Sequence, residues 1–142
     1  MKKLTQNIYV SGQISSNDFA QMRNSGIKAI INNRPDGEEA GQLSAAEAAK
    51  LANEHNMDYH YLPMVNGQPL ETSLVEDFKS IIDANDGPIL THCRSGMRST
   101  FIWALGQIQA GTITVDDAIS SAQAAGIPLS NARPALEAVV PK

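Results

Sequence analysis

The chain has 142 residues, of which 42% are hydrophobic and 18% charged, a composition typical of one folded domain over residues 1–142. Its net charge of −4 argues against nucleic acid as the main partner, because a phosphate backbone is bound by a basic face. No apolar run has the length of a signal-peptide core or a membrane span, so we expect no membrane partner. The single cysteine, Cys93, excludes an intramolecular disulfide and favours a cytoplasmic location.

The first half of the chain alternates short apolar runs with helical patterns. A strand is predicted at Ile8–Gly12, followed by a helix over 15–24 that ends at a serine-glycine stop. The next apolar run, 28–33, is predicted to be a buried strand that ends at an Arg-Pro-Asp-Gly turn. An alanine-rich helix is predicted from 44 to about 55, because its first residues form a capping box. The alternating aromatic run 58–64 predicts another strand.

The second half continues this alternation. A capping box over Ser73–Glu76 predicts a helix with one apolar face, and the run 89–92 predicts a short buried strand. Three more helices are predicted at 99–110, 114–125 and 131–139. Strands that alternate with helices of this length predict an α/β fold with a central, mostly parallel sheet and helices on both faces.

In such a sheet, ligands bind outside the carboxyl ends of the strands. Three predicted loops leave the sheet at those ends, namely Asn32–Gly37, Pro63–Gly67 and Cys93–Arg98. We therefore expect these three loops to converge on one crevice.

The loop Cys93–Arg98, called the cysteine loop below, has the residues of an anion site. Its backbone N–H groups and those of the following helix are expected to point at one concave site, and Gly96 permits the turn. Arg98 adds a planar fork of donors, and the same dipoles favour a nucleophilic Cys93 thiolate. The other predicted site residues are the loop residues Arg94, Ser95 and Met97, then Ser99 as a hydrogen-bond donor to the sulfur and His92 as an orienting group.

The string "HC…R-S" after a buried strand resembles the signature loop of cysteine-dependent tyrosine and dual-specificity phosphatases. That family places five residues between cysteine and arginine, whereas this chain has four, and "CRSGMRS" is more similar to the loops of rhodanese-type sulfurtransferases. Over most of its length the chain resembles the phosphatase-like domain of bacterial beta-lactamase-hydrolase-like proteins, through the blocks "YVSGQIS", "NRPDGE", "YLPM" and "HCRSGMRS". The resemblance implies a phosphatase-like fold and leaves the reaction open, because a fold does not fix a function.

Two features of the sequence favour sulfur transfer through a Cys93 persulfide. The shorter loop suits a small sulfur atom, and Asn66 stands about where the phosphatase pattern has an aspartic acid that protonates the leaving group. Asp36, Glu38 or Glu39 would be an unusual replacement for this acid. The interpretation predicts an anionic sulfur donor and an external thiol acceptor as partners. The first alternative is a phosphatase that acts on a phosphorylated substrate through a phosphocysteine, and the second is an inactive anion-binding module.

Three residues are weighed as possible rim residues of the site, namely Arg34, Asp36 and Asn66. Arg34 is placed to extend the positive rim of the crevice, with Asp36 holding Arg34 or Arg98 in position. A turn with solvated charges explains Arg34 and Asp36 equally well. The histidines lack metal-ligand spacing with Cys93, so we expect neither a metal nor another cofactor.

Overall fold

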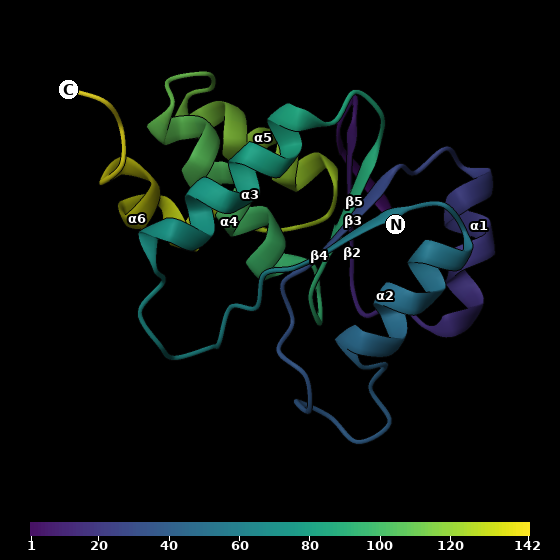
Figure 1. The fold of residues 1–142 in the computed structure, drawn as a ribbon. Coiled ribbons are helices and arrows are strands. Elements are labelled where there is room, and N and C mark those ends of the chain that lie inside the picture. The colour runs from purple at the N-terminus through teal and green to yellow at the C-terminus, as the bar shows by residue number, and fades with distance from the viewer.

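A five-stranded sheet with the order β1-β2-β5-β3-β4 runs through the centre of the computed structural model, which describes residues 1–142 (Figure 1). Strand β1 is antiparallel to β2, and all the other neighbouring strands are parallel. The strands are β1 (Lys2–Thr5), β2 (Ile8–Ser11), β3 (Ala29–Asn32), β4 (Asp58–Tyr61) and β5 (Ile89–His92). This arrangement confirms the predicted α/β fold with a mostly parallel sheet.

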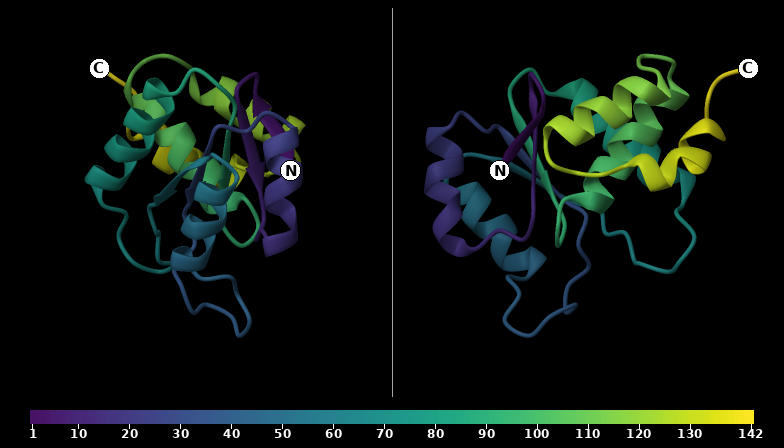
Figure 2. Two further views of the ribbon diagram at one scale, coloured as in Figure 1. Left: turned by 45° about the vertical axis from the view of Figure 1, so that its right-hand side comes forward. Right: turned by 180° about the vertical axis from the view of Figure 1, so that it is seen from behind.

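The helices cover both faces of the sheet, as Figures 1 and 2 show. On one face lie α1 (Phe19–Asn24) and α2 (Ala45–Glu54), and their apolar residues join Ile30 of β3 in one core cluster. The opposite face packs against four helices and includes Ile31, the next residue of the same strand. These helices are α3 (Thr72–Ala84), α4 (Met97–Gln109), α5 (Val115–Ala124) and α6 (Arg133–Glu137). No helix combines the length and the apolar character that crossing a bilayer would require.

Several element boundaries differ from the predicted ones. Strand β1 was not expected, because its "KKLT" residues carry no alternating apolar pattern, and only Leu4 is buried. Helix α3 begins at Thr72 with Glu71 at the N-cap, so the predicted capping box over Ser73–Glu76 does not form. The predicted last helix is a 3-10 turn followed by the short α6.

The boundaries that position the cysteine loop agree well with the sequence. Strand β5 occupies 89–92 as predicted, and all four of its residues are buried. Helix α4 begins at Met97, two residues earlier than expected, because Gly96 has a left-handed backbone at φ 93° and serves as the N-cap. The chain therefore turns from strand to helix within residues 93–96.

Candidate active site at the cysteine loop

The last residues of the four parallel strands lie in one row across the sheet. Ser11 of β2 pairs with His92 of β5, His92 pairs with Asn32 of β3, and Asn32 pairs with Tyr61 of β4. The segments that follow these strands, including the loops 33–44 and 62–71 and the cysteine loop, therefore leave the same edge. The predicted convergence of three loops is confirmed by direct contacts of Arg98 with Glu38 and with Met64.

Cys93 lies where these loops meet and has no exposed surface. Its sulfur accepts a hydrogen bond from the backbone N–H of Gly96 at 3.1 Å. The segment after β2 also holds the cysteine loop, since the N–H of Gln13 donates to the carbonyl of Arg94 at 3.3 Å. A Cβ at Gly12 would lie 2.8 Å from that carbonyl oxygen, so only glycine permits this close approach. The cysteine loop is thus held between β2 and α4 with its sulfur facing inward.

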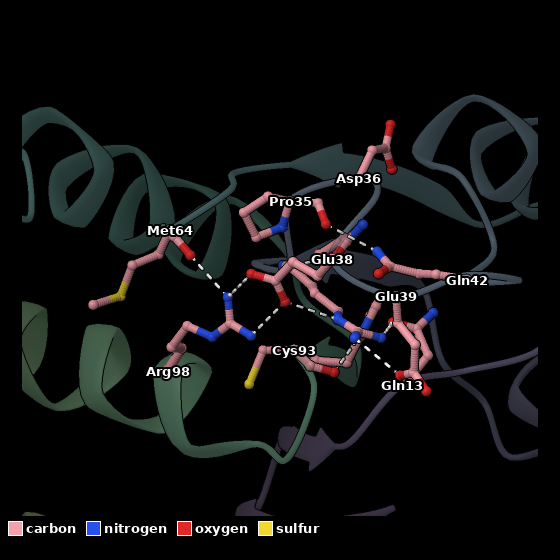
Figure 3. A network of polar contacts seen from close by, with 12 residues as sticks. Gln13, Pro35, Asp36, Glu38, Glu39, Gln42, Met64, Cys93 and Arg98 are labelled. Atoms are coloured by element: carbon pink, nitrogen blue, oxygen red, sulfur yellow. Dashed lines mark hydrogen bonds and ion pairs between the residues drawn. The ribbon is translucent and has the colours of Figure 1, made fainter. Parts of the chain in front are cut away.

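Arg98 is fixed in two directions beside Cys93 (Figure 3). Its Nη1 and Nη2 donate to the two carboxylate oxygens of Glu38 at 2.8 and 2.9 Å, and Nη1 also donates to the Met64 carbonyl at 2.9 Å. These contacts leave Nε–H and the second Nη2–H without a hydrogen bond to a protein oxygen. The free pair forms one edge of the guanidinium, and such an edge matches two oxygens of a bound oxyanion.

Glu38 is the acidic partner of two buried arginines. Hydrogen bonds from Arg98 and then from Arg34 lower the pKa of Glu38 to about 2, although partial burial opposes the shift. The same pairing raises the pKa of Arg98, and the neighbouring Cys93 sulfur adds to that rise. Glu38 is consequently ionised at neutral pH and has no proton to give to a leaving group.

Arg34 supports Glu38 and does not extend the rim. Its side chain is 1% exposed, and its Nε donates to Glu38 at 2.9 Å. The other two nitrogens donate to Gln13 Oε1 at 3.0 Å and to Glu39 Oε2 at 3.3 Å. All three guanidinium nitrogens of Arg34 therefore donate hydrogen bonds to protein side chains, one of them to Glu38. The sequence placed Arg34 near the site correctly, but the structure gives it a different position from the expected rim.

Asp36 does not make the contact that we expected with an arginine. Its Oδ1 accepts a hydrogen bond from the N–H of Ala45 at 2.8 Å, which places it at the start of α2. Glu38, two residues further along, holds both Arg34 and Arg98 instead. The sequence signalled a carboxylate partner in this turn, but three acidic residues lie within four positions and their side-chain directions depend on the loop conformation.

Ser99 differs from its expected role, whereas the orienting role expected of His92 stays a prediction. The Ser99 hydroxyl donates to Asn33 Oδ1 at 2.8 Å rather than to the Cys93 sulfur. Burial lowers the pKa of His92 to about 4, so its imidazole is neutral at physiological pH. The closest partner of His92 Nδ1 is the Cys93 carbonyl at 3.4 Å, and Nε2 is buried without a partner. Both residues are buried and lie beside the two ends of the cysteine loop.

Asn33 is a site residue that the sequence analysis missed. Its Oδ1 accepts from Thr91 at 2.9 Å as well as from Ser99, and its Nδ2 donates to the Leu62 carbonyl at 2.8 Å. One buried amide therefore ties β5 and α4 to the segment after β4. The sequence placed Asn33 in a loop expected to reach the site and in the block "NRPDGE", but neither signal reveals these partners.

The remaining predicted residues lie on the outside of the site. Arg94, Ser95 and Met97 are exposed on the cysteine loop, and Asn66 is exposed on the loop 62–71. No carboxylic acid is hydrogen-bonded to the cysteine loop except Glu38, through Arg98. The chain has no cluster of three or more His, Cys, Asp or Glu residues that is placed to bind a metal.

Comparisons with known proteins identify relatives over most of the chain. Residues 1–112 match the family model described as "Beta-lactamase hydrolase-like protein, phosphatase-like domain". A beta-lactamase hydrolase-like protein of Agrobacterium fabrum is 31% identical over 115 residues, which are 81% of this chain but only 26% of that relative. The chain therefore spans about a quarter of the length of that relative.

Solved structures share the fold over nearly the whole chain. A crystal structure of a candidate phosphatase from Neisseria meningitidis has a TM-score of 0.86 and 34% identity, and the match covers 97% of this chain and 96% of that one. The active form of Tk-PTP has a TM-score of 0.74 with 12% identity, over 96% of this chain and 92% of that one. At that identity the second match shows the fold alone.

Proposed function

Because the chain belongs to the family of phosphatase-like domains of beta-lactamase hydrolase-like proteins, we propose that it is a cysteine-dependent phosphatase. The proposal assigns it the hydrolysis of phosphate monoesters through a phosphorylated Cys93. The observation that carries the proposal is the free Nε–Nη2 edge of Arg98, which Glu38 and the Met64 carbonyl hold beside the Cys93 sulfur. A phosphoryl group has the paired oxygens that this edge would bind.

The residues would act in two displacement steps. Arg98 and the backbone N–H groups of the cysteine loop hold the phosphoryl oxygens, and the Cys93 thiolate attacks phosphorus. The bond between phosphorus and the leaving oxygen breaks, and that oxygen departs with the electron pair. Water then attacks the phosphocysteine, its proton passes to solvent, and phosphate and the thiolate are released. No oxidant or reductant takes part in either step.

The absence of a poised acid has a consequence for the choice of substrate. Asp36 is engaged at the start of α2, Glu38 is ionised, and Asn66 carries no acidic proton. The leaving oxygen must therefore take its proton from water, which favours aryl and acyl phosphates, whose leaving groups are weak bases. Alkyl phosphates should react much more slowly.

Sulfane sulfur transfer is the second candidate, and two observations favour it. The cysteine loop has only four residues between Cys93 and Arg98, and sulfur transfer needs no acid when sulfite is the leaving group. The Cys93 thiolate would attack the outer sulfur of thiosulfate, and the sulfur–sulfur bond would break with the electron pair leaving on sulfite. An external thiolate or cyanide would then remove the sulfur from the persulfide and restore the Cys93 thiolate.

One side-by-side assay separates these functions. Phosphate release from aryl phosphate and thiocyanate formation from thiosulfate and cyanide are measured for wild type and for Cys93→Ser, Arg98→Lys and Arg133→Lys. Arg133 is the matched control, because it is also paired with carboxylates but lies at the surface. We expect phosphate release that Cys93→Ser abolishes, that Arg98→Lys lowers roughly 100-fold, and that Arg133→Lys leaves unchanged.

Other results would select a different function. Thiocyanate formation without phosphate release would reject the phosphatase in favour of the sulfurtransferase. The absence of both activities, with anion binding retained in Cys93→Ser, would indicate the inactive anion-binding module.

A further inference from the structure

Gln13, in the segment after β2, makes contacts with two different parts of the site (Figure 3). Its backbone N–H donates to the carbonyl of Arg94 in the cysteine loop at 3.3 Å. Its side-chain Oε1 accepts from Nη1 of the buried Arg34 at 3.0 Å, and its Nε2 donates to the Ile14 carbonyl at 2.9 Å. The amide therefore has one partner for its oxygen and one for its nitrogen, which together fix its orientation.

The backbone before Gln13 also contacts the cysteine loop. The carbonyl of Ser11 accepts from the N–H of Cys93 at 3.4 Å. At Gly12 a Cβ would lie 2.8 Å from the carbonyl oxygen of Arg94. Residues 11–13 thus contact the first two residues of the cysteine loop in succession, and this places the Gln13 side chain at a defined position beside Arg34.

The contacts of Gln13 complete a ring of hydrogen bonds around the site. From Gln13 the ring passes to Arg34, whose Nε donates to Glu38 at 2.9 Å. Glu38 accepts from both Nη atoms of Arg98, at 2.8 and 2.9 Å, and Arg98 lies in the first turn of α4. The chain from Arg98 back to Arg94 closes the ring. The two ends of the cysteine loop are therefore connected by side chains outside the loop as well as by the loop itself.

Gln13 is the uncharged acceptor in this ring. The charges of Arg34 and Arg98 are balanced by those of Glu38 and Glu39, which pair with them. The side chain of Arg34 is 1% exposed, so a lost acceptor at Nη1 would leave a buried N–H without a partner. Arg34 would then turn toward another acceptor, and Glu38 would no longer be held from behind.

We propose that Gln13 is a positioning residue, which acts through Arg34 and Glu38 to fix the direction of the free edge of Arg98. Gln13 has no contact with the bound anion in this role. The inference rests on the proposed function for its effect on turnover. The hydrogen bond to Arg94 uses the backbone of Gln13 and survives a change of its side chain, so a substitution tests the link to Arg34 alone.

The test measures the dissociation constant of vanadate, an oxyanion that the protein does not turn over. Gln13→Met keeps about the length of the side chain and removes the acceptor for Arg34. We expect it to weaken vanadate binding about three- to tenfold, the range for one lost hydrogen bond. Gln42→Met is the matched control, because Gln42 lies in the same loop as Glu38 but donates to the Pro35 carbonyl at 2.9 Å, outside the ring. Its vanadate binding should equal that of wild type.

Two further measurements separate positioning from a general loss of stability. When it is added to Glu38→Gln, Gln13→Met should weaken vanadate binding by less than about twofold more, because Gln13 acts through Glu38. The Nε–H NMR signal of Arg98, assigned with Arg98→Lys, should shift in Gln13→Met and keep its position in Gln42→Met.

Unchanged vanadate binding in Gln13→Met, or an equal loss in Gln42→Met, would overturn the role of Gln13. Fold changes that multiply in the double variant would overturn it as well. Phosphate release from an aryl phosphate is measured in parallel to test the proposed function alone. If wild type releases none while the Arg98 signal still shifts in Gln13→Met, the phosphatase is refuted and the positioning role stands. If that signal does not shift either, both are refuted.

Discussion

Glu38 is the side chain through which the two buried arginines are joined. It accepts from Arg98 with both oxygens and from Arg34 with one, so the free edge of Arg98 has a fixed direction beside Cys93. Glu38 itself needs no contact with the substrate for this effect. We therefore regard it as a positioning residue that acts through Arg98.

Replacement of Glu38 tests this role. Glu38→Gln keeps the size of the side chain but removes its charge and one acceptor, so Arg98 should lose its fixed direction. We expect kcat to fall roughly 10- to 100-fold, the range for a misplaced catalytic group, and vanadate inhibition to weaken. The control is Glu39→Gln, because the Glu39 side chain is 60% exposed and its ion pair is with Arg34 and not with Arg98. Equal losses in the two variants would contradict the role of Glu38.

The low pKa of Glu38 also predicts how stability depends on pH. Because the folded-state pKa is about 2 and the ordinary value is 4.5, the ion pairs stabilise the fold fully above pH 4.5. Their contribution is lost as pH falls from 4.5 toward 2. The difference in Tm between wild type and Glu38→Gln should therefore be largest at pH 5 to 7 and shrink below pH 4.5. The buried neutral His92 affects both proteins alike, and a difference that stays constant down to pH 2.5 would contradict the prediction.

Among single residues, the sequence predicted Cys93 and Arg98 as the central pair, but it did not predict the hydrogen bonds that hold them in position. The spacing of Cys93 and Arg98 in one loop brought them together correctly, because few conformations connect a strand to a helix in so few residues. The hydrogen bonds that support this pair join residues far apart in the chain. Arg98 and Glu38 are separated by 60 positions, and Ser99 bonds to Asn33 on another segment. Contacts at that separation depend on tertiary packing, which local patterns do not encode.

Among the secondary-structure elements, the turn from β5 into α4 depends on Gly96. Its φ of 93° lies in the left-handed region, and its N–H donates to the Cys93 sulfur. A Cβ at this position would also meet Ile127 Cδ1 at 3.1 Å and Val10 Cγ2 at 3.3 Å. Both the backbone angle and the surrounding side chains therefore disfavour any other residue.

Gly96→Ala should consequently be more harmful than another left-handed glycine replacement. Gly126 has φ 82°, and a Cβ there would have no neighbouring atom within 4 Å, so Gly126→Ala should cost only about 1 kcal/mol for the backbone. We expect Gly96→Ala to cost more than that in chemical denaturation and to lose most activity, because the loop must shift away from the sulfur. Equal costs in the two variants, with activity retained, would contradict this account of the loop.

The elements themselves were predicted where local signals were strong. Strand β5 and the cap of α2 agree with the sequence, because Ser44 makes the expected side-chain cap. Thr114 caps α5 in the same way, which the sequence analysis did not predict. Strand β1 was missed because it is an edge strand with exposed lysines, and its existence depends on pairing with β2. The start of α3 was misplaced because Glu71 and Thr72 already adopt the N-terminal geometry that the Ser73 pattern suggested.

For the molecule as a whole, the alternation of strands and helices was sufficient to predict which edge of the sheet carries the site. The family match confirms the resemblance to phosphatase-like domains, and it agrees with the predicted fold. The reaction is a separate matter. The loop length and Asn66 favoured sulfur transfer from the sequence, whereas the family match and the Neisseria meningitidis structure at 34% identity give better support to the phosphatase alternative. A shared scaffold fixes where Cys93 lies but not which atom it attacks.

The covalent intermediate on Cys93 is therefore the most direct test of the proposed chemistry. Wild-type protein is mixed with an aryl phosphate, quenched during turnover, digested and mapped by mass spectrometry. We predict the mass of one phosphoryl group on the peptide that contains Cys93, and none in Cys93→Ser. An unmodified Cys93 peptide throughout phosphate release, or a phosphoryl group on another side chain, would contradict the central role of this thiolate.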